Sequence, residues 1–169
     1  MTGRIKFHGD PIEEDTLYVA LYERKAFGEP YHWALLLTGP GEAGQIHQAT
    51  DRTGTWVYEV KELTQVEPTK SMICLVGIGN ISPDKRPEAL EAMKSVPVLP
   101  DGGTLRTGEP FNCRTWLKLA VGALQKAGIL DLPLHVEDIE TTLRHKASGL
   151  VPFVGREGGR VPAVTARII

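Results

Sequence analysis

Hydrophobic positions in the first half of the chain fall into segments of strand length, and residues 54–63 alternate with the two-residue period of β-strands. These segments are rich in β-branched and aromatic residues, and Gly- and Pro-rich turns separate them. The stretch "SMICLVGIGNI" is a near-continuous apolar run of strand length, which indicates a buried strand. The predicted strands cover residues 16–23, 31–39, 44–51, 54–63 and 71–81.

The pattern changes to helical spacing in the second half. A Pro-led segment with helical composition follows the last strand, and residues 97–110 form a loop dense in Pro and Gly. The predicted helices cover residues 85–96, 113–127 and 135–147. The tail after residue 149 is rich in Gly and Pro and allows one short strand. The order predicts a single α+β domain over residues 1–169, with helices packed against an antiparallel sheet.

Composition narrows the class of protein. The 169 residues are 41% hydrophobic and 24% charged, which is typical of a globular domain. The formal net charge of -2 comes without a basic stripe, so no nucleic-acid partner is expected. No apolar run is long enough for a membrane span, and the first residues lack the apolar core of a signal peptide. Two cysteines make no disulfide framework, so a reducing, cytoplasmic location is expected.

One of the two cysteines stands at the start of the best predicted helix. Asn112 is a preferred N-cap residue, and Phe111 and Trp116 have the spacing of a hydrophobic staple. Cys113 is then the first helical residue, where free amide groups lower a thiol pKa and can stabilise an oxyanion. The alternative is that Cys113 is a small, partly buried residue without chemistry.

Two strand histidines are candidates for the base that a cysteine nucleophile requires. If Thr38 pairs with Gln45 across the intervening turn, His32 lies opposite Asp51 and shares one face of the hairpin with His47. A slip of one residue would place the two histidines on different faces. The alternative is two ordinary histidines in a sheet. No HExxH, CxxC or paired-carboxylate spacing marks a metal site, and neither a metal nor a cofactor is predicted.

The motif order "HWAL…G…IH…NCRTWL" resembles the circularly permuted papain-like proteins. Among characterised groups it is similar to the lecithin retinol acyltransferases and, more distantly, to permuted cysteine isopeptidases and NlpC-type bacterial cell-wall peptidases. It resembles most closely a small fungal family of unknown function. The resemblance covers residues 16–130 and implies Cys113 as nucleophile, His32 as general base and His47 as the group that orients His32.

The predicted function is therefore cysteine-dependent acyl transfer, either hydrolysis or transfer, on an ester, thioester or amide of a small molecule or peptide. The competing hypothesis is a non-catalytic binding domain on the same fold. The distance between the Cys113 sulfur and His32 distinguishes them. Asn112, Gln45 and Asp51 are expected to support the site, and Tyr31, Trp33 and Trp116 to form the walls of its pocket.

Overall fold

The computed structural model describes residues 6–24, 29–132, 135–154 and 160–165. Its centre is a seven-stranded sheet with the strand order β1-β7-β6-β2-β3-β4-β5. Neighbours from β6 to β5 are antiparallel, whereas β7 runs parallel to both β6 and β1. The strands are β1 (Lys6–Gly9), β2 (Thr16–Glu23), β3 (Tyr31–Thr38), β4 (Gly44–Thr50), β5 (Val57–Leu63), β6 (Met72–Asn80) and β7 (Arg160–Thr165).

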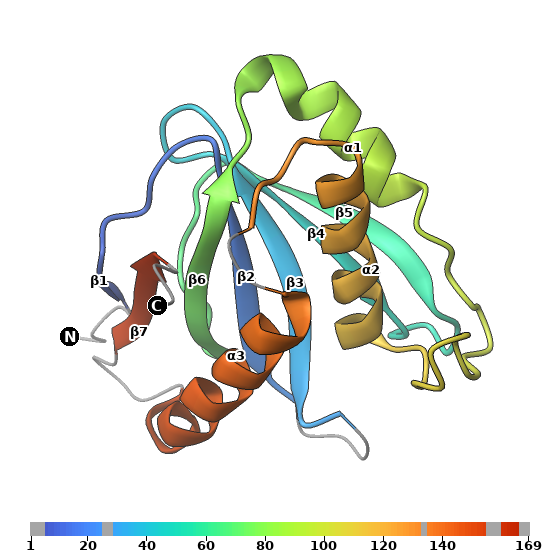
Figure 1. The fold of residues 1–169 in the computed structure, drawn as a ribbon. Helices are drawn as coiled ribbons and strands as arrows, with labels where there is room; N and C mark the ends of the chain where they lie inside the picture. The colour runs from blue at the N-terminus through green and yellow to red at the C-terminus, as the bar shows by residue number, and fades with distance from the viewer. Residues whose placement is uncertain (1–5, 25–28, 133–134, 155–159, 166–169) are drawn as a thin grey trace.

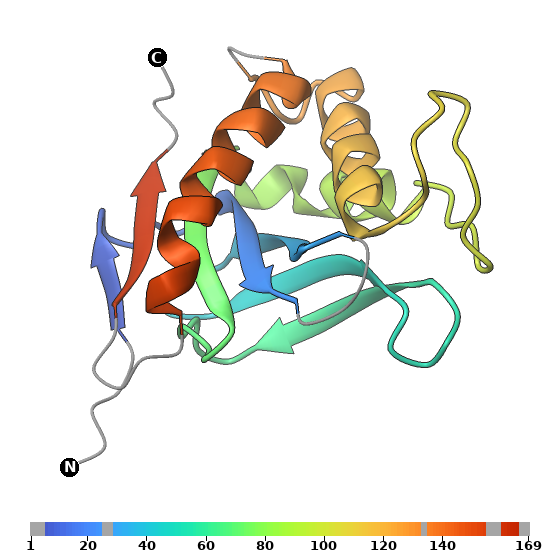
Figure 2. The same cartoon turned by 90° about the horizontal axis from the view of Figure 1, so that it is seen from below.

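Three α-helices follow β6, and they lie on one side of the sheet (Figures 1 and 2). They are α1 (Arg86–Lys94), preceded by the 3₁₀ turn Pro83–Lys85, α2 (Cys113–Lys126), and α3 (Val136–Leu150), followed by the 3₁₀ turn Val151–Phe153. The α+β class, the five antiparallel strands and the three helices are confirmed. The parallel pair β1 and β7 at one edge was not predicted, apart from a possible strand in the tail.

The two faces of the sheet have different surroundings. The face under the helices carries the main core, in which Trp33 of β3 and Trp116 of α2 are among the largest fully buried side chains. The opposite face carries a smaller apolar cluster around Tyr18, Leu36 and Met72. Figure 2 shows no helix over this second face in the part of the chain that the structure describes. We call it the open face.

The hairpin of β3 and β4 has a register that differs by one residue from the expected one. Thr38 pairs with Gly44, not with Gln45, so Gly44 belongs to the strand and the loop is one residue shorter. A Cβ atom on Gly44 would meet Val66 Cγ2 at 2.8 Å and Leu36 Cδ1 at 3.2 Å. Only a residue without a side chain fits at this position without displacing Val66 and Leu36, so the packing suits Gly44 as a strand residue. Side chains of successive strand residues point to opposite faces of the sheet. The shift of one residue therefore places each β4 side chain on the face opposite to the expected one.

The start of α2 is confirmed in detail. The Asn112 side chain accepts hydrogen bonds from the amides of Arg114 and Thr115, and the Thr115 hydroxyl accepts one from the Asn112 amide. This reciprocal arrangement is a capping box. Phe111 and Trp116, the predicted staple pair, are both buried. Cys113 is therefore the first residue of α2, held by a rigid helix start.

Candidate functional site

The expected gathering of His32, His47 and Asp51 on one face of the hairpin is wrong. His32 pairs with Tyr22 across β2 and faces the open side, whereas His47 pairs with Leu35 and faces the helices. The one-residue register shift at Gly44 is the physical reason. Among the described residues no hydrogen bond joins the two histidines.

Cys113 lies against the backbone of β3 on the helix side of the sheet. Its side chain is fully buried in the main core, and its thiol donates a hydrogen bond to the Tyr31 carbonyl at 3.7 Å. No hydrogen bond of the described residues connects it to His32. Burial raises the pKa of the Cys113 thiol, and this outweighs the lowering by the Trp33 amide, the positive charge of Arg24 and the Arg114 amide. The expectation of a lowered thiol pKa is therefore wrong, because desolvation dominates over the helix start.

His47 is likewise inaccessible. It is fully buried, and its Nδ1 atom lies 2.8 Å from the Tyr58 hydroxyl. Tyr58 stacks on Trp116. Among the described residues, neither His47 Nε2 nor the buried indole nitrogen of Trp116 has a hydrogen-bond partner. Burial lowers the pKa of His47 to about 4, so the ring is neutral at pH 7. His47 is thus part of the interior beneath α2 and does not orient His32.

A groove lined by polar, charged and apolar side chains opens on the other face, around His32. Its volume is about 400 Å³, within the usual range for small-molecule sites. Its walls come from the end of β2, the start of β3, β4 with the turn after it, β5 and the loop before β6. The lining residues are Tyr22, Glu23, Arg24, His32, Ile46, Gln48, Thr50, Asp51, Arg52, Lys61, Thr69 and Ser71.

His32 is held in this groove by a chain of polar contacts. Its Nε2 atom lies 2.6 Å from Gln48 Oε1, and Gln48 Nε2 donates to Glu59 Oε2 at 2.7 Å. Glu59 also forms an ion pair with Arg52. The ring of Tyr22 lies 5.9 Å from that of His32, centroid to centroid. Gln48 therefore occupies the orienting position that was expected of His47.

The electrostatics of the groove favour a neutral His32. Burial lowers the pKa of His32; the Gln48 hydrogen bond raises it, and the positive charges of Arg24 and Arg52 lower it further. Arg24 itself forms an ion pair with Asp51 at 3.3 Å. No ion pair joins Lys61 to another described residue. The groove thus combines a neutral imidazole with cationic groups at its rim.

The remaining predicted site residues are dispersed. Gln45 donates to Glu62 and does not contact His32, whereas Asp51 lines the groove. None of the three aromatic residues predicted as pocket walls lines the groove. Tyr31 contributes its carbonyl to Cys113, and Trp33 and Trp116 are almost fully buried in the main core.

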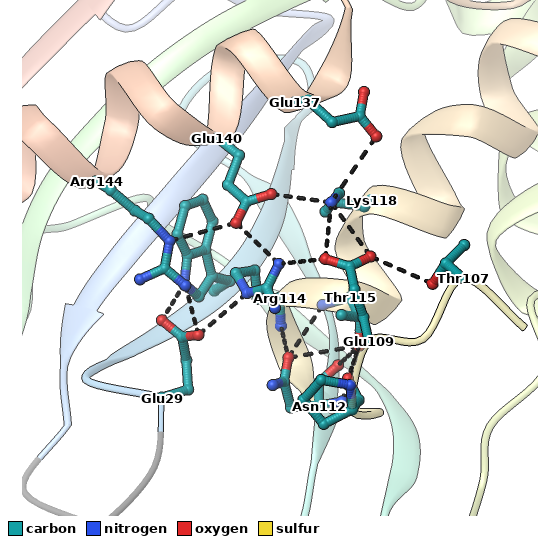
Figure 3. A network of polar contacts seen from close by, with 12 residues as sticks. Glu29, Thr107, Glu109, Asn112, Arg114, Thr115, Lys118, Glu137, Glu140 and Arg144 are labelled. Atoms are coloured by element: carbon teal, nitrogen blue, oxygen red, sulfur yellow. Dashed lines mark hydrogen bonds and ion pairs between the residues drawn. The ribbon is translucent and has the colours of Figure 1, made fainter. Parts of the chain in front are cut away.

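A buried network of charges fixes the start of α2 beside Cys113 (Figure 3). The side chain of Arg114, 9% exposed, forms ion pairs with Glu29 at 3.1 Å, Glu109 at 3.1 Å and Glu140 at 2.8 Å. Further ion pairs join Lys118 to Glu109, Glu137 and Glu140, and Arg144 to Glu29 and Glu140. The network ties α2 to α3 and to the segment before β3, and it leaves Cys113 little freedom to move.

The groove could have been suspected from one signal that the sequence analysis did not use. One face of β4 carries Ile46, Gln48 and Thr50, and the other carries His47 and Ala49. The polar side chains of Gln48 and Thr50 indicate that the first face is not entirely buried in a core. Nothing in the described ranges brings together three or more His, Cys, Asp or Glu side chains in a way that could hold a metal ion. Likewise, no helix in those ranges is both long and apolar enough to cross a bilayer.

Comparison with known proteins identifies the family to which the chain belongs. The model of DUF6914, a family of unknown function, matches residues 14–147. The chain belongs to this family. The matched range begins just before β2 and ends within α3, so His32, Cys113 and the groove lie inside it, and β1 and β7 lie outside. No curated protein and no solved structure matches the chain.

Proposed function

We propose that this member of DUF6914 binds a small polar molecule in the groove on the open face. The observation that carries the proposal is the groove itself, a volume of about 400 Å³ lined by His32 and by side chains of both charges. Ligand sites of this size combine a few fixed polar groups with a preformed hollow. The chain Arg52–Glu59–Gln48–His32 supplies such fixed groups.

The test is a comparison of variants that fill the groove or leave it open. Ser71 is exposed at its rim, so Ser71→Trp places an indole in the volume without disturbing the core. Ser148→Trp adds the same side chain at an exposed position of α3, on the other side of the sheet. Each protein is equilibrated with a metabolite extract, desalted and denatured, and the released molecules are identified by mass spectrometry.

We expect the wild type and Ser148→Trp to release the same molecule and Ser71→Trp to lose it. Equal release from all three proteins, or release from none, would contradict the proposal. A stable fold of Ser71→Trp, checked by circular dichroism, makes the comparison valid.

Acyl transfer through Cys113, on a permuted papain-like fold, is the second candidate. The observation in its favour is the position of Cys113 at the first turn of α2, where the positive end of the helix dipole favours a thiolate. The Arg114 and Thr115 amides are already bonded to the Asn112 side chain. In this mechanism the thiol loses its proton to a base and the sulfur bonds to the acyl carbon. The leaving group departs with a proton, and water or an acceptor then cleaves the thioester.

This second candidate requires a thiol that reagents can reach. We expect iodoacetamide to label Cys113 of Cys74→Ala more slowly than free cysteine at every pH from 6 to 9, because the sulfur is buried and its pKa is raised. Labelling at pH 6 that is faster than that of free cysteine would instead support the acyl-transfer mechanism and an opened site.

A further inference from the structure

The contacts around His32 define which of its ring nitrogens carries the proton. Glu59, paired with Arg52, is a carboxylate that can only accept hydrogen bonds, so the group of Gln48 that faces it is the NH₂ donor. The carbonyl oxygen of Gln48 then faces His32 at 2.6 Å and needs a donor. Nε2 of His32 therefore bears hydrogen, and in the neutral ring Nδ1 is an acceptor with a free lone pair.

This acceptor is open to the groove. Nδ1 of His32 makes no hydrogen bond with a described residue. The buried polar atoms that lack a partner in the described part of the chain are His47 Nε2 and Trp116 Nε1, and Nδ1 is not one of them. Nδ1 is therefore accessible to solvent, on a residue that lines the groove.

The rim beside it carries cations that a small anion can contact. Arg24, Arg52 and Lys61 line the groove, and the nearby carboxylates are Glu23 and Asp51 of the lining and Glu59, the ion-pair partner of Arg52, so the formal charges balance. Arg24 binds Asp51, and Arg52 binds Glu59, each through one terminal nitrogen. Other N–H groups of both guanidiniums therefore remain for a ligand. Guanidinium groups are well suited to phosphate and carboxylate.

We propose that the groove recognises a small phosphate or carboxylate that also carries a hydroxyl group, with the hydroxyl donating to His32 Nδ1 and the anion bound by the arginines. This proposal rests on the binding function proposed above and names its ligand class. An anion alone cannot use Nδ1, because a lone pair repels it, whereas a hydroxyl supplies the hydrogen that Nδ1 lacks.

The test has two parts, both on the full chain. Long-range ¹⁵N–¹H correlation spectra of the ¹⁵N-labelled protein at pH 7.5 show directly which nitrogen of His32 is protonated, with His32→Phe to assign the signals. Titration with glycerol 3-phosphate and with propyl phosphate then compares two probes that differ in hydroxyl groups. Both titrations are repeated on His32→Phe, which keeps a planar ring and removes the acceptor.

We expect a protonated Nε2 and about fivefold tighter binding of glycerol 3-phosphate, the value of one net hydrogen bond. In His32→Phe the preference should vanish while propyl phosphate binds as before. A protonated Nδ1, equal binding of the two probes by the wild type, or a preference that persists in His32→Phe would overturn the proposal.

Failure of this proposal can be separated from failure of the binding function. If neither probe binds but the groove-dependent capture of a metabolite persists, the ligand class is wrong and the groove remains a binding site. If Ser71→Trp and the wild type also release the same molecules, both proposals fail. The tautomer measurement needs no ligand, so the protonation of His32 Nε2 is tested in every case.

Discussion

Acidification should destabilise this protein through one buried side chain, His47. The ring is fully buried, and burial lowers its pKa from the ordinary value of 6.5 to about 4. Above pH 6.5 the ring is neutral in both the folded and unfolded states, so it causes no pH dependence. As the pH falls below 6.5, the unfolded chain binds a proton that the folded chain excludes, and the free energy of unfolding decreases until about pH 4.

The size of this effect follows from the two pKa values. The gap between 6.5 and about 4 corresponds to about 3 kcal/mol when fully expressed, and to roughly 2 kcal/mol at pH 5. Other groups titrate in the same range, so the effect must be isolated by a variant. His47→Gln keeps a polar side chain beside Tyr58 and removes the titrating ring.

The assay is urea unfolding at pH 8, 7, 6 and 5 for the wild type and His47→Gln. At pH 8 we expect the wild type to have a larger free energy of unfolding than His47→Gln. This difference should shrink by about 2 kcal/mol at pH 5. His145→Gln, at an exposed position of α3, is the control and should parallel the wild type. Parallel curves for the wild type and His47→Gln would refute the reasoning and show that a proton reaches the buried ring without cost.

Three further substitutions test the packing around the candidate sites. Arg114→Met should lower the free energy of unfolding by about 3 kcal/mol in a urea titration, because it leaves the buried carboxylates of Glu29 and Glu140 short of a partner; a loss below about 1 kcal/mol would show that they rearrange freely. Asn112→Ala removes the capping box and should cost about 1 kcal/mol in the same assay, with an unchanged value as the contrary result. Gly44→Ala should lower the stability by about 1 to 3 kcal/mol, measured by thermal unfolding, because the added Cβ would crowd Val66, Leu36 and the Leu37 carbonyl. A stabilised protein would show that these neighbours move without strain.

Local signals were enough to predict most elements of the fold. Strand-like composition between Gly- and Pro-rich turns identifies β2 to β5, and an apolar run of strand length identifies β6. The cap at Asn112 with the staple of Phe111 and Trp116 identifies the start of α2. These signals involve residues close together in sequence, so residue propensities and the hydrophobic pattern are enough to detect them. Strand β1 and its pairing with β7 escape prediction because the paired segments lie more than 150 positions apart.

The site could not be predicted in the same way, because it depends on one residue of register. Whether Gly44 belongs to the turn or to the strand is decided by Val66 and Leu36, side chains that pack against it from elsewhere in the fold. That choice places His32 beside Gln48 on the open face and His47 in the interior. The sequence indicates His32 as a candidate, but it does not indicate Gln48 as the neighbour of His32.

The parallel pairing of β1 with β7 has a consequence for the order in which the protein is assembled. In the part of the chain that the structure describes, β1 has no strand neighbour except β7, which also pairs with β6 (Figure 1). Residues 6–9 are synthesised well before residues 160–165, so β1 has no strand of the described residues to pair with until β7 has been made. The segments from β2 to α3 can meanwhile form their local contacts, so this edge of the sheet closes after them.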